Sequence, residues 1–405
     1  MKSIMDKLNT ERLILLRGVL RDGAVGALVN AIEQNSVEEY ARAYGSLLSA
    51  DMENSFAGYL SDLILRSDNL FARRACTAQP NLELCAALKS DLRILQRLAK
   101  SAETPPPSVR EAQKDGFPAV RYGRDDGLFG TDWGADETIR RLADFYKTNG
   151  YGIYIGNKAF TFEDGTLRPV RNTPDVTLND LKDYTAEKKA VEDNVVNFIE
   201  GLPYSNMLLY GDKGTGKSST VHAMLNKYAE KGLRAVEIPK EQICSINAAK
   251  EVLSSLPFKF ILFIDDLSLE ERDEKVTALK AGLEGSIHER SSNVMIAATS
   301  NRRHIVKENF SDRDNSVHAR DTMEEQLSLS DRFGLTVCFS STGKAEYLSI
   351  VRQLAADRKL SVSDEELCTL AERWAILKGG RSPRRAKQFV DFAYSCLAKG
   401  MPIEF

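Results

Sequence analysis

One short stretch of the sequence spaces glycines, a lysine and hydroxyl side chains in a way that suits phosphate chemistry. It matches the pattern G-x-x-x-x-G-K-[ST] and follows directly on an apolar run. Its members are Gly211, Asp212, Lys213, Gly214, Thr215, Gly216, Lys217, Ser218 and Ser219. In such a loop the glycines let backbone N–H groups turn toward phosphate oxygens, Lys217 reaches the β- and γ-phosphates, and the Ser218 hydroxyl binds Mg²⁺. The stretch predicts a site for a nucleotide and Mg²⁺.

Two neighbouring aspartates form a second candidate. Asp265 and Asp266 follow the apolar run "FKFILFI". Ligands of parallel sheets bind at the carboxyl ends of the strands, so Asp265 is predicted to organise Mg²⁺ and Asp266 to orient or deprotonate a water molecule. An acidic pair after a strand is as often a helix or turn cap when it stands alone. The phosphate loop favours the catalytic interpretation here.

Beyond residue 174, short apolar runs alternate with helical periodicity, which predicts an α/β fold with a parallel sheet. The five expected strands are 206–210, 234–238, 260–264, 294–299 and 335–339.

The rest of the chain divides by composition. Residues 1–100 show helical periodicity and predict an all-α amino-terminal domain, and 101–142, with three consecutive prolines, predict a linker. A helix end and a small β-meander are expected over 143–177, with turns at Gly156-Asn157 and Asp164-Gly165. The nucleotide-binding domain is expected over 178–341, and helices over 342–405 form a carboxy-terminal lid.

Composition limits the function classes. The 405 residues carry a formal net charge of -3, so no overall basic field indicates a nucleic-acid partner. Six cysteines without a C-x-x-C pair and four histidines give no pattern for a zinc site or a disulfide framework. No apolar run approaches the roughly 20 residues of a membrane span, and a cytoplasmic protein is predicted.

Several motifs, in this order and spacing, resemble those of AAA+ ATPases. "GDKGTGKSS", "FILFIDDLS", "IAATSNRR", "LSLSDRFGLTVCF" and "GGRSPRRA" are similar to Walker A, Walker B, sensor 1, the arginine finger and sensor 2. The resemblance runs from about Leu178 to Lys399. Within the superfamily, the wording of the motifs is most similar to a bacterial family described as domain of unknown function 815.

The resemblance implies roles for further residues. The segment from Leu181 to Tyr184 is expected along the adenine and ribose. Asn301 or its neighbour Ser300 takes the sensor 1 place, where a polar side chain positions the attacking water.

It also assigns two arginines. Arg332 matches the arginine finger, which implies a homo-oligomer in which the finger reaches the γ-phosphate of the adjacent subunit. Arg384, or Arg385 beside it, matches the sensor 2 residue that brings the lid over the nucleotide.

Two departures bear on function. The stretch "PKEQICSINAAKEVLSSLPFK" has room for about one helix, so the insertion typical of replication initiators and helicase loaders is not expected. Asp266 stands where the superfamily usually has glutamate, which bears on the rate of hydrolysis rather than on nucleotide binding.

The polar stretch 302–326 carries Arg302, Arg303, Lys307, Arg313 and Arg320. Phe310 is its one aromatic residue, so base stacking is poorly supported, and a subunit interface or a solvated loop is favoured over a nucleic-acid contact.

Together these features predict an ATPase that couples Mg-ATP hydrolysis to remodelling or regulation of a protein partner, recruited through the amino-terminal domain. Two alternatives stay open. One is a nucleic-acid-directed ATPase of the helicase-loader or transposition-accessory type. The other is a slow ATP-dependent scaffold or switch.

Overall fold

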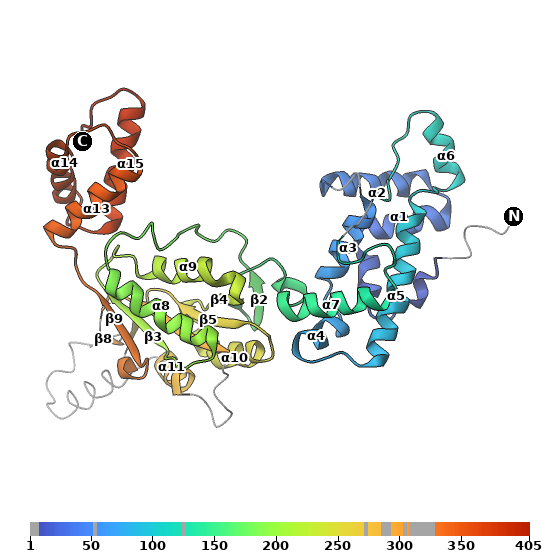
Figure 1. Cartoon of the computed structure of the whole chain (residues 1–405), viewed down its shortest axis with the longest axis horizontal. Helices are drawn as coiled ribbons and strands as arrows, with labels where there is room; N and C mark the ends of the chain where they lie inside the picture. The colour runs from blue at the N-terminus through green and yellow to red at the C-terminus, as the bar shows by residue number, and fades with distance from the viewer. Residues whose placement is uncertain are drawn as a thin grey trace. The chain divides into compact units, whose positions relative to one another are not determined.

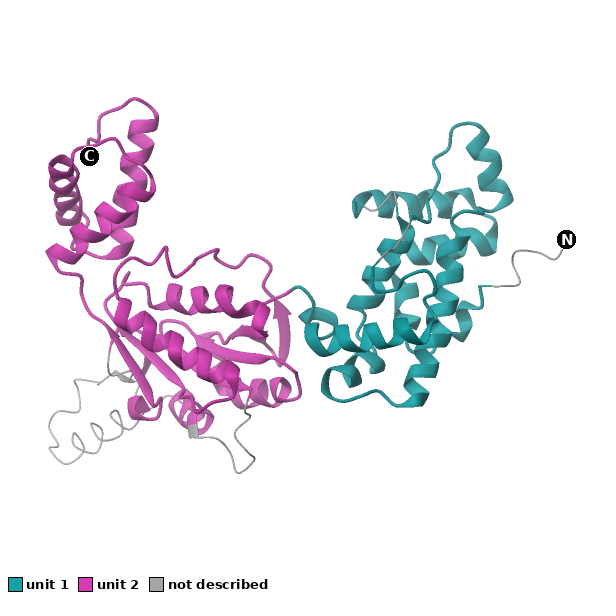
Figure 2. Cartoon of the chain, viewed as in Figure 1, with its two compact units in different colours: residues 1–156 teal, residues 157–405 magenta. Residues whose placement is uncertain are grey.

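The computed structural model describes residues 8–51, 55–123, 127–270, 274–284, 293–302, 306–307 and 329–405. The chain forms two compact units, Met1–Gly156 and Asn157–Phe405, here called unit 1 and unit 2 (Figure 2).

Unit 1 is built from helices, as the periodicity of its sequence predicted. They are α1 (Gly23–Gln34), α2 (Val37–Ser49), α3 (Phe56–Arg66), α4 (Leu70–Thr77), α5 (Leu82–Ser101), α6 (Pro107–Lys114) and α7 (Asp136–Asn149), with 3₁₀ turns η2 (Thr10–Arg12), η3 (Arg17–Arg21) and η4 (Gly152–Tyr154). Five of the helices begin after a side chain that accepts a hydrogen bond from the first turn: Asp22, Ser36, Ser55, Asn69 and Asn81. These caps satisfy N–H groups that lack partners inside the helix.

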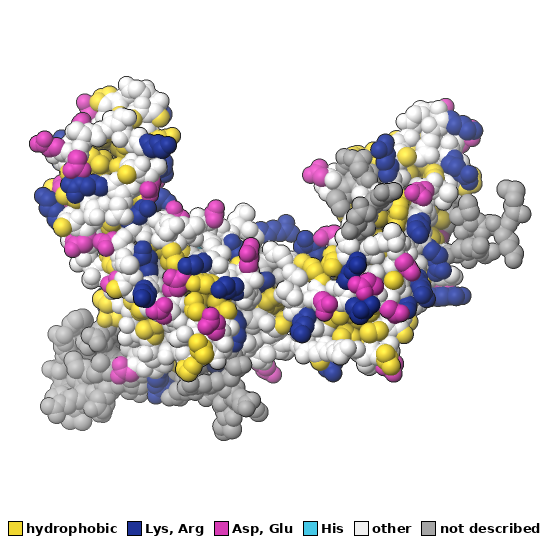
Figure 3. All heavy atoms as spheres, in the orientation of Figure 1, with side chains coloured by type: hydrophobic (Ala, Val, Ile, Leu, Met, Phe, Trp, Pro, Cys, Tyr) yellow, Lys and Arg dark blue, Asp and Glu magenta, His cyan; other side chains and the backbone are white. Residues whose placement is uncertain are grey.

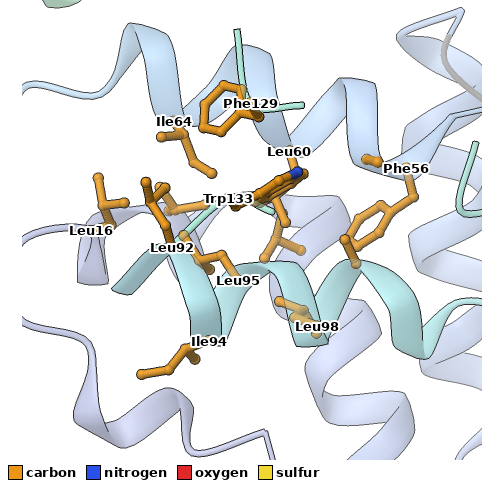
Figure 4. Packing of buried hydrophobic residues seen from close by; sticks show 14 of the residues in the cluster. Leu16, Phe56, Leu60, Ile64, Leu92, Ile94, Leu95, Leu98, Phe129 and Trp133 are labelled. Carbon is orange, nitrogen blue, oxygen red and sulfur yellow. The ribbon is translucent and has the colours of Figure 1, made fainter. Parts of the chain in front are cut away.

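The core of unit 1 centres on a buried tryptophan. Trp133 lies among side chains of α3 and α5, with Leu60 and Leu95 beside it (Figure 4). Its ring lies 5.0 Å from that of Phe129.

The linker predicted over 101–142 differs from the structure. Val109, Val120 and Trp133 from this segment are buried in the same core as α1–α5, and unit 1 extends to Gly156. The prolines stand at the start of a helix: Pro106 precedes α6 and Pro107 is its first residue. The first residue of a helix has no partner for its N–H inside the helix, so a proline is tolerated there.

Unit 2 contains a seven-stranded sheet (Figure 1). Its strands are β1 (Ala159–Glu163), β2 (Thr166–Pro169), β3 (Met207–Gly211), β4 (Leu233–Glu237), β5 (Lys259–Ile264), β7 (Val294–Ser300) and β9 (Leu335–Phe339). The order is β2-β1-β4-β5-β7-β3-β9, and all pairs are parallel except β1 with β2. A separate short pair joins β6 (Leu269–Glu270) to β8 (Val306–Lys307).

The five predicted strands are all present, but the predicted count of five is wrong. The segment expected as a separate β-meander forms the hairpin β1–β2, which adds two strands beside β4. Its turn is Asp164-Gly165, both at positive φ, as predicted. A two-stranded hairpin is marginally stable alone, so pairing with β4 is the stable arrangement.

Helices cover this sheet and complete its core. They are α8 (Thr185–Glu200), α9 (Lys217–Tyr228), η5 (Ala229–Lys231), η6 (Lys240–Ser245), α10 (Ile246–Ser254) and α11 (Glu274–Glu284). Val191 and Val195 of α8 and Met224 of α9 pack on Ile261 and Met295 of the sheet. The connection from β4 to β5 holds η6 and α10, with no long insertion.

The last helices, α13 (Lys344–Asp357), α14 (Asp364–Leu377) and α15 (Pro383–Ala398), lie where the sequence predicted helices. Trp374 and Phe389 belong to their own apolar core. Among the described helices of both units, none is long and apolar enough to cross a membrane.

Candidate functional site

A cavity of about 490 Å³ lies at the carboxyl end of the parallel strands in unit 2. The predicted site residues that line it are Leu181, Tyr184, Lys213, Gly214, Thr215, Gly216, Lys217, Ser218, Ser219, Asp265, Asp266, Asn301 and Arg384. Gly211, Asp212 and Arg332 are not among the lining residues. The cavity therefore brings together groups that are spread over two hundred residues of sequence.

The glycines of the loop after β3 are required by its backbone. Gly211, Gly214 and Gly216 have φ of 130°, 79° and 100°. A Cβ on Gly211 would lie 2.0 Å from the carbonyl oxygen of Phe339 in β9. These conformations favour glycine, and they turn the loop so that α9 begins at Lys217, with its amino end at the cavity.

Lys217 is buried, with 7% of its surface exposed. Its Nζ donates to the carbonyl oxygens of Gly211 (2.8 Å) and Asp212 (2.7 Å) and to Oδ1 of Asn301 (3.4 Å). Burial lowers the pKa of Lys217, while the nearby aspartates oppose this shift. In the part of the chain that the structure describes, no carboxylate forms an ion pair with it. A buried ammonium group with only neutral partners, at the wall of a cavity, is suited to a phosphate ligand.

Asp265 is held by hydroxyl groups at the end of β5. Its Oδ1 accepts hydrogen bonds from Ser218 Oγ (2.5 Å) and Thr299 Oγ1 (2.6 Å). A carboxylate beside a serine hydroxyl is an oxygen donor set that fits Mg²⁺. Among the described residues there is no cluster of three or more His, Cys, Asp or Glu side chains that could hold a metal. In proteins Mg²⁺ is commonly bound by one or two carboxylates, with phosphate oxygens and water as further ligands.

Asp266 has a different environment from its neighbour. Its φ of 51° is in the left-handed region, and its backbone N–H donates to Thr299 Oγ1 at 2.8 Å. Its carboxylate accepts a hydrogen bond from the Asn301 amide and forms an ion pair with Lys240 Nζ at 3.0 Å. The side chains of Asp266 and Lys240 are 56% and 41% exposed, so this ion pair is in contact with solvent.

The sequence analysis missed Lys240 and Thr299. Lys240 follows β4 and Thr299 is the next-to-last residue of β7, and these strands flank β5 in the sheet. Their proximity to the aspartates follows from the order of the strands in the sheet, and short sequence motifs do not give this order.

Ser300 and Asn301, the alternatives for sensor 1, point in different directions. Ser300 is buried, and its hydroxyl donates to the carbonyl oxygen of Leu267 at 2.9 Å. Asn301 lines the cavity and contacts both Lys217 and Asp266. The geometry brings Asn301 to the site.

The segment before α8 closes another side of the cavity. Asp183 and Tyr184 both have positive φ, and the Tyr184 hydroxyl donates to the carbonyl oxygen of Ser340 at 2.6 Å. Lys182 forms an ion pair with Asp357 of α13 at 2.7 Å. These contacts attach the segment to both the sheet and the carboxy-terminal helices.

The start of α15 touches the phosphate loop. The backbone N–H of Arg384 donates to the carbonyl oxygen of Gly214 at 3.1 Å, and Arg384 lines the cavity. Arg385 is not among the lining residues, and its guanidinium lies near Gly380. Lys387, which the sequence analysis did not select, lines the cavity one turn after Arg384.

Arg332 lies away from the cavity of its own chain. It directly precedes β9, which is parallel to β3, so it lies at the opposite end of the sheet from the phosphate loop. Of the other arginines considered at this interface, Arg303, Arg313 and Arg320 lie outside the described residues.

Comparisons with known proteins give one family and several distant structures. A family model described as "Protein of unknown function (DUF815)" matches residues 156–396. No functionally curated protein is significantly similar to the chain. RuvB of Thermotoga maritima, titled a Holliday junction branch migration motor, is similar at 16% identity with a TM-score of 0.40, over 56% of this chain and 67% of that one. The FIGL-1 AAA domain in complex with ADP is similar at 17% identity with a TM-score of 0.38, over 56% and 76% of the two chains. Because the family model spans more than half of the residues, as the motifs indicated, the chain belongs to the DUF815 family.

Proposed function

We propose that the chain is an AAA+ ATPase that binds Mg-ATP in the cavity of unit 2 and hydrolyses it to ADP and phosphate. The observation that carries the proposal is Lys217, a buried ammonium group in a glycine-shaped loop, with Asp265 and Ser218 beside it. The direct hydrogen-bond partners of this ammonium group are neutral oxygens of Gly211, Asp212 and Asn301, so a phosphate supplies the negatively charged partner that they do not.

The contacts of each residue suggest its role in nucleotide binding. Leu181 and Tyr184 lie along the adenosine, and Lys217 and the loop N–H groups bind the phosphates. Ser218 and Asp265 would hold Mg²⁺, which when bound neutralises charge on the phosphate oxygens.

Asp266 and Asn301 are hydrogen-bonded to each other at the cavity wall. Asp266 can therefore orient the attacking water molecule, while Asn301 holds the carboxylate of Asp266 in position. Arg384 is connected to the loop through Gly214, so closure of α13–α15 over a nucleotide would bring its charge to the phosphates.

Calorimetric titration of the full chain with ATP and Mg²⁺ tests nucleotide binding. Lys217→Ala should weaken ATP binding about 10- to 100-fold, because it removes a charge-assisted contact to the phosphates. Lys189→Ala, an exposed lysine of α8 that does not line the cavity, is the matched control and should bind normally. Normal ATP binding by a folded Lys217→Ala variant would refute the assignment.

We further propose that the enzyme is a homo-oligomer in which Arg332 acts on the nucleotide of the adjacent subunit. Its place at the far end of the sheet supports this role, because it cannot line the cavity of its own chain. Arg332→Ala should bind ATP but hydrolyse it about 10³-fold or more slowly. Mixing Arg332→Ala with Lys217→Ala should restore part of the activity, since some interfaces then pair an intact finger with an intact loop. No rescue, with activity per chain independent of concentration, would contradict the oligomeric mechanism.

One observation favours a second candidate, a slow nucleotide-dependent switch that regulates a partner bound by unit 1. Asp266 is shorter than the usual glutamate, and Lys240 pairs with the carboxylate that should act on water. Lys240→Gln should then raise turnover several-fold while leaving ATP affinity unchanged. Lys231→Gln, an exposed lysine remote from Asp266, serves as the control. If Lys240→Gln leaves turnover unchanged or lowers it, Lys240 does not restrain Asp266.

A further inference from the structure

A surface hollow of about 440 Å³ lies beside the exposed face of α5 in unit 1. Its lining residues are Asn9, Arg12, Ala86, Lys89, Ser90, Arg93, Ile94 and Arg97, and we call it the α5 hollow. Lys89, Arg93 and Arg97 recur every four residues, so they lie on one side of the helix about 6 Å apart along its axis. None of the described lining residues is acidic.

Two of its cations, Arg93 and Arg97, form no direct ion pair with any acid in the described ranges, and both are exposed. After the hydrogen bond and the charge of Lys89, however, the charge of Arg93 also acts on Asp136 and contributes to the lowered pKa of that carboxyl.

Some exposed arginines of unit 1 form ion pairs, such as Arg66 with Asp62 and Arg73 with Asp68, and others, such as Arg74 and Arg110, form none with the acids that the structure describes. What distinguishes the hollow is that its cations gather in one place. On the one face that Figure 3 draws, positive and negative side chains are interspersed. The charged residues that line the α5 hollow are all positive.

The other two cations are only partly neutralised. Lys89 forms an ion pair with Asp136 at 2.8 Å, and Asp136 lies at the start of α7 with 85% of its side chain exposed. Arg12 lies 3.6 Å from Glu11, and both side chains are more than two-thirds exposed. Exposed pairs of this kind contribute little, so an anion can compete for the lysine and arginine.

The hollow is held in place by a buried carboxylate. Asp91 of α5 is fully buried and accepts hydrogen bonds from the backbone N–H groups of Ile14 (2.9 Å), Leu15 (2.7 Å) and Leu16 (2.9 Å). These bonds attach the amino-terminal segment to α5 and so bring Arg12 next to a helix about eighty residues away in sequence.

Gly134 leaves room for one of the arginines. A Cβ at this position would lie 2.4 Å from Cγ of Arg93. Cγ, Cδ and Nε of Arg93 all lie against the backbone of Gly134, which holds this side chain in place where it lines the hollow. A preorganised cation loses less entropy when it binds a ligand.

Neutral donors complete the chemistry. The Ser90 hydroxyl and the Asn9 amide line the hollow, and neither has a side-chain hydrogen-bond partner among the described residues. Guanidinium groups match the geometry of phosphate oxygens, and hydroxyl and amide groups donate to the remaining ones. No lining residue in the described set is aromatic, so the hollow offers no platform for stacking bases.

The uncompensated charge selects the kind of anion. The four cations of the hollow stand against two neighbouring acids, Glu11 and Asp136, which leaves an excess of two positive charges. This excess matches a phosphomonoester, which carries about -1.5 to -2 near neutral pH. A carboxylate or a backbone phosphodiester supplies a single charge at one point. We propose that the α5 hollow binds a doubly charged phosphate group, carried either by a free small molecule or by a phosphorylated side chain. This site is separate from the nucleotide cavity of unit 2.

Calorimetry on the full chain tests the proposal, with Lys217→Ala present in every variant to suppress phosphate binding in unit 2. The probes are inorganic pyrophosphate and a short capped peptide whose one charged residue is phosphoserine. Arg93→Gln with Arg97→Gln should weaken binding about 100-fold, because each arginine contributes roughly tenfold. Lys100→Gln, on the same helix but outside the hollow, should change affinity by no more than about twofold.

The two probes separate the two sources. Binding of pyrophosphate alone indicates a small-molecule ligand, and tighter binding of the peptide indicates a phosphorylated partner. The proposal fails if the arginine variant binds as well as its parent. It fails equally if neither probe binds, or if a glutamate peptide or a short DNA duplex binds as tightly as the phosphate probes.

A charge-preserving variant serves as a control for misfolding of the glutamine variant. Arg93→Lys with Arg97→Lys keeps both charges but removes the bidentate forks, and it should lie between the parent and the glutamine variant in affinity. Thermal unfolding that matches the parent establishes that each variant is folded.

Discussion

The polar site of unit 2 and the α5 hollow of unit 1 both collect positive charge, but the chain assembles them in different ways. In unit 2 the functional groups follow strand ends, so a parallel sheet brings them to one edge, and glycine conformations set the loop. In unit 1 the cations lie along one helix, and a buried carboxylate brings in a fourth from a distant segment. We therefore expect the site of unit 2 to be most sensitive to changes in the side chains that would contact the ligand. The α5 hollow should also be sensitive to Asp91, which does not line it but holds the segment that carries Arg12.

The largest effect should come from Asp265, the carboxylate at the strand end. Asp265→Asn keeps the shape but removes a charge from the proposed Mg²⁺ site. ATP turnover should fall by about 100-fold or more, since the metal contributes several kcal/mol to such reactions. A steady-state phosphate-release assay measures this.

Asp193→Asn is the matched control, because Asp193 of α8 is exposed and does not line the cavity. Equal turnover in both variants would mean that Asp265 does not serve a metal site.

The next effect should come from Asp91, behind the α5 hollow. Asp91→Ala leaves three backbone N–H groups without their acceptor, which should lower the free energy of unfolding by about 2 to 4 kcal/mol. The chain has two tryptophans, so Trp374→Phe leaves Trp133 as a fluorescence reporter of unit 1 during urea unfolding.

Two comparisons sharpen this prediction. Asp91→Asn retains an acceptor oxygen and should lose less stability. Asp22→Ala removes a cap in the same unit that bonds two N–H groups and serves as a reference of ordinary size. If Asp91→Ala costs no more than Asp22→Ala, the buried carboxylate is not the principal support of the amino-terminal segment.

Much of unit 2 could be predicted because the residues that identify its strands and its site lie next to one another in the sequence. The G-x-x-x-x-G-K-S stretch, the five apolar strands and Asp265 each appear in a short window of sequence. Lys240 and Thr299 could not be found this way, since their contact with the aspartates arises from the order of strands, which is a long-range property.

Three other features depended on tertiary packing. A small β-meander with a turn at Asp164-Gly165 was predicted where the hairpin β1–β2 forms, but its pairing with β4 was not, because local patterns do not fix which strand edge is occupied. The proline-rich segment has the composition of a linker, and only the burial of Val109 and Trp133 identifies it as part of a core. The α5 hollow needs Arg12 on the same hollow as the cations of α5, a proximity that no short motif encodes.

A smaller effect is expected where the loop meets the carboxy-terminal helices. Gly214 has φ of 79°, and a Cβ there would lie 3.1 Å from the Cβ of Arg384. Gly214→Ala should therefore cost backbone strain of about 1 to 2 kcal/mol. It should also weaken ATP binding about tenfold by displacing Arg384 from the phosphates.

Gly232→Ala separates these two contributions. Gly232 has φ of 88° with nothing near its Cβ position, so the substitution should impose strain alone. Unfolding curves should then show similar losses for both variants, while ATP titration should distinguish them. If both bind ATP equally well, the contact between Gly214 and Arg384 has no role in nucleotide binding.

The smallest effect tests whether the two sites are independent. A fragment of residues 157–405 keeps every residue that lines the nucleotide cavity, together with the hairpin that completes the sheet. Its ATP affinity should equal that of the full chain within about twofold, because distant sites usually contribute independently. A cut at Pro105–Pro107 should instead give an insoluble product, since Val109 and Trp133 would lose the core that buries them. A loss of more than about tenfold in ATP affinity for the 157–405 fragment would mean that unit 1 takes part in nucleotide binding, and the two sites would then have to be treated as one coupled system.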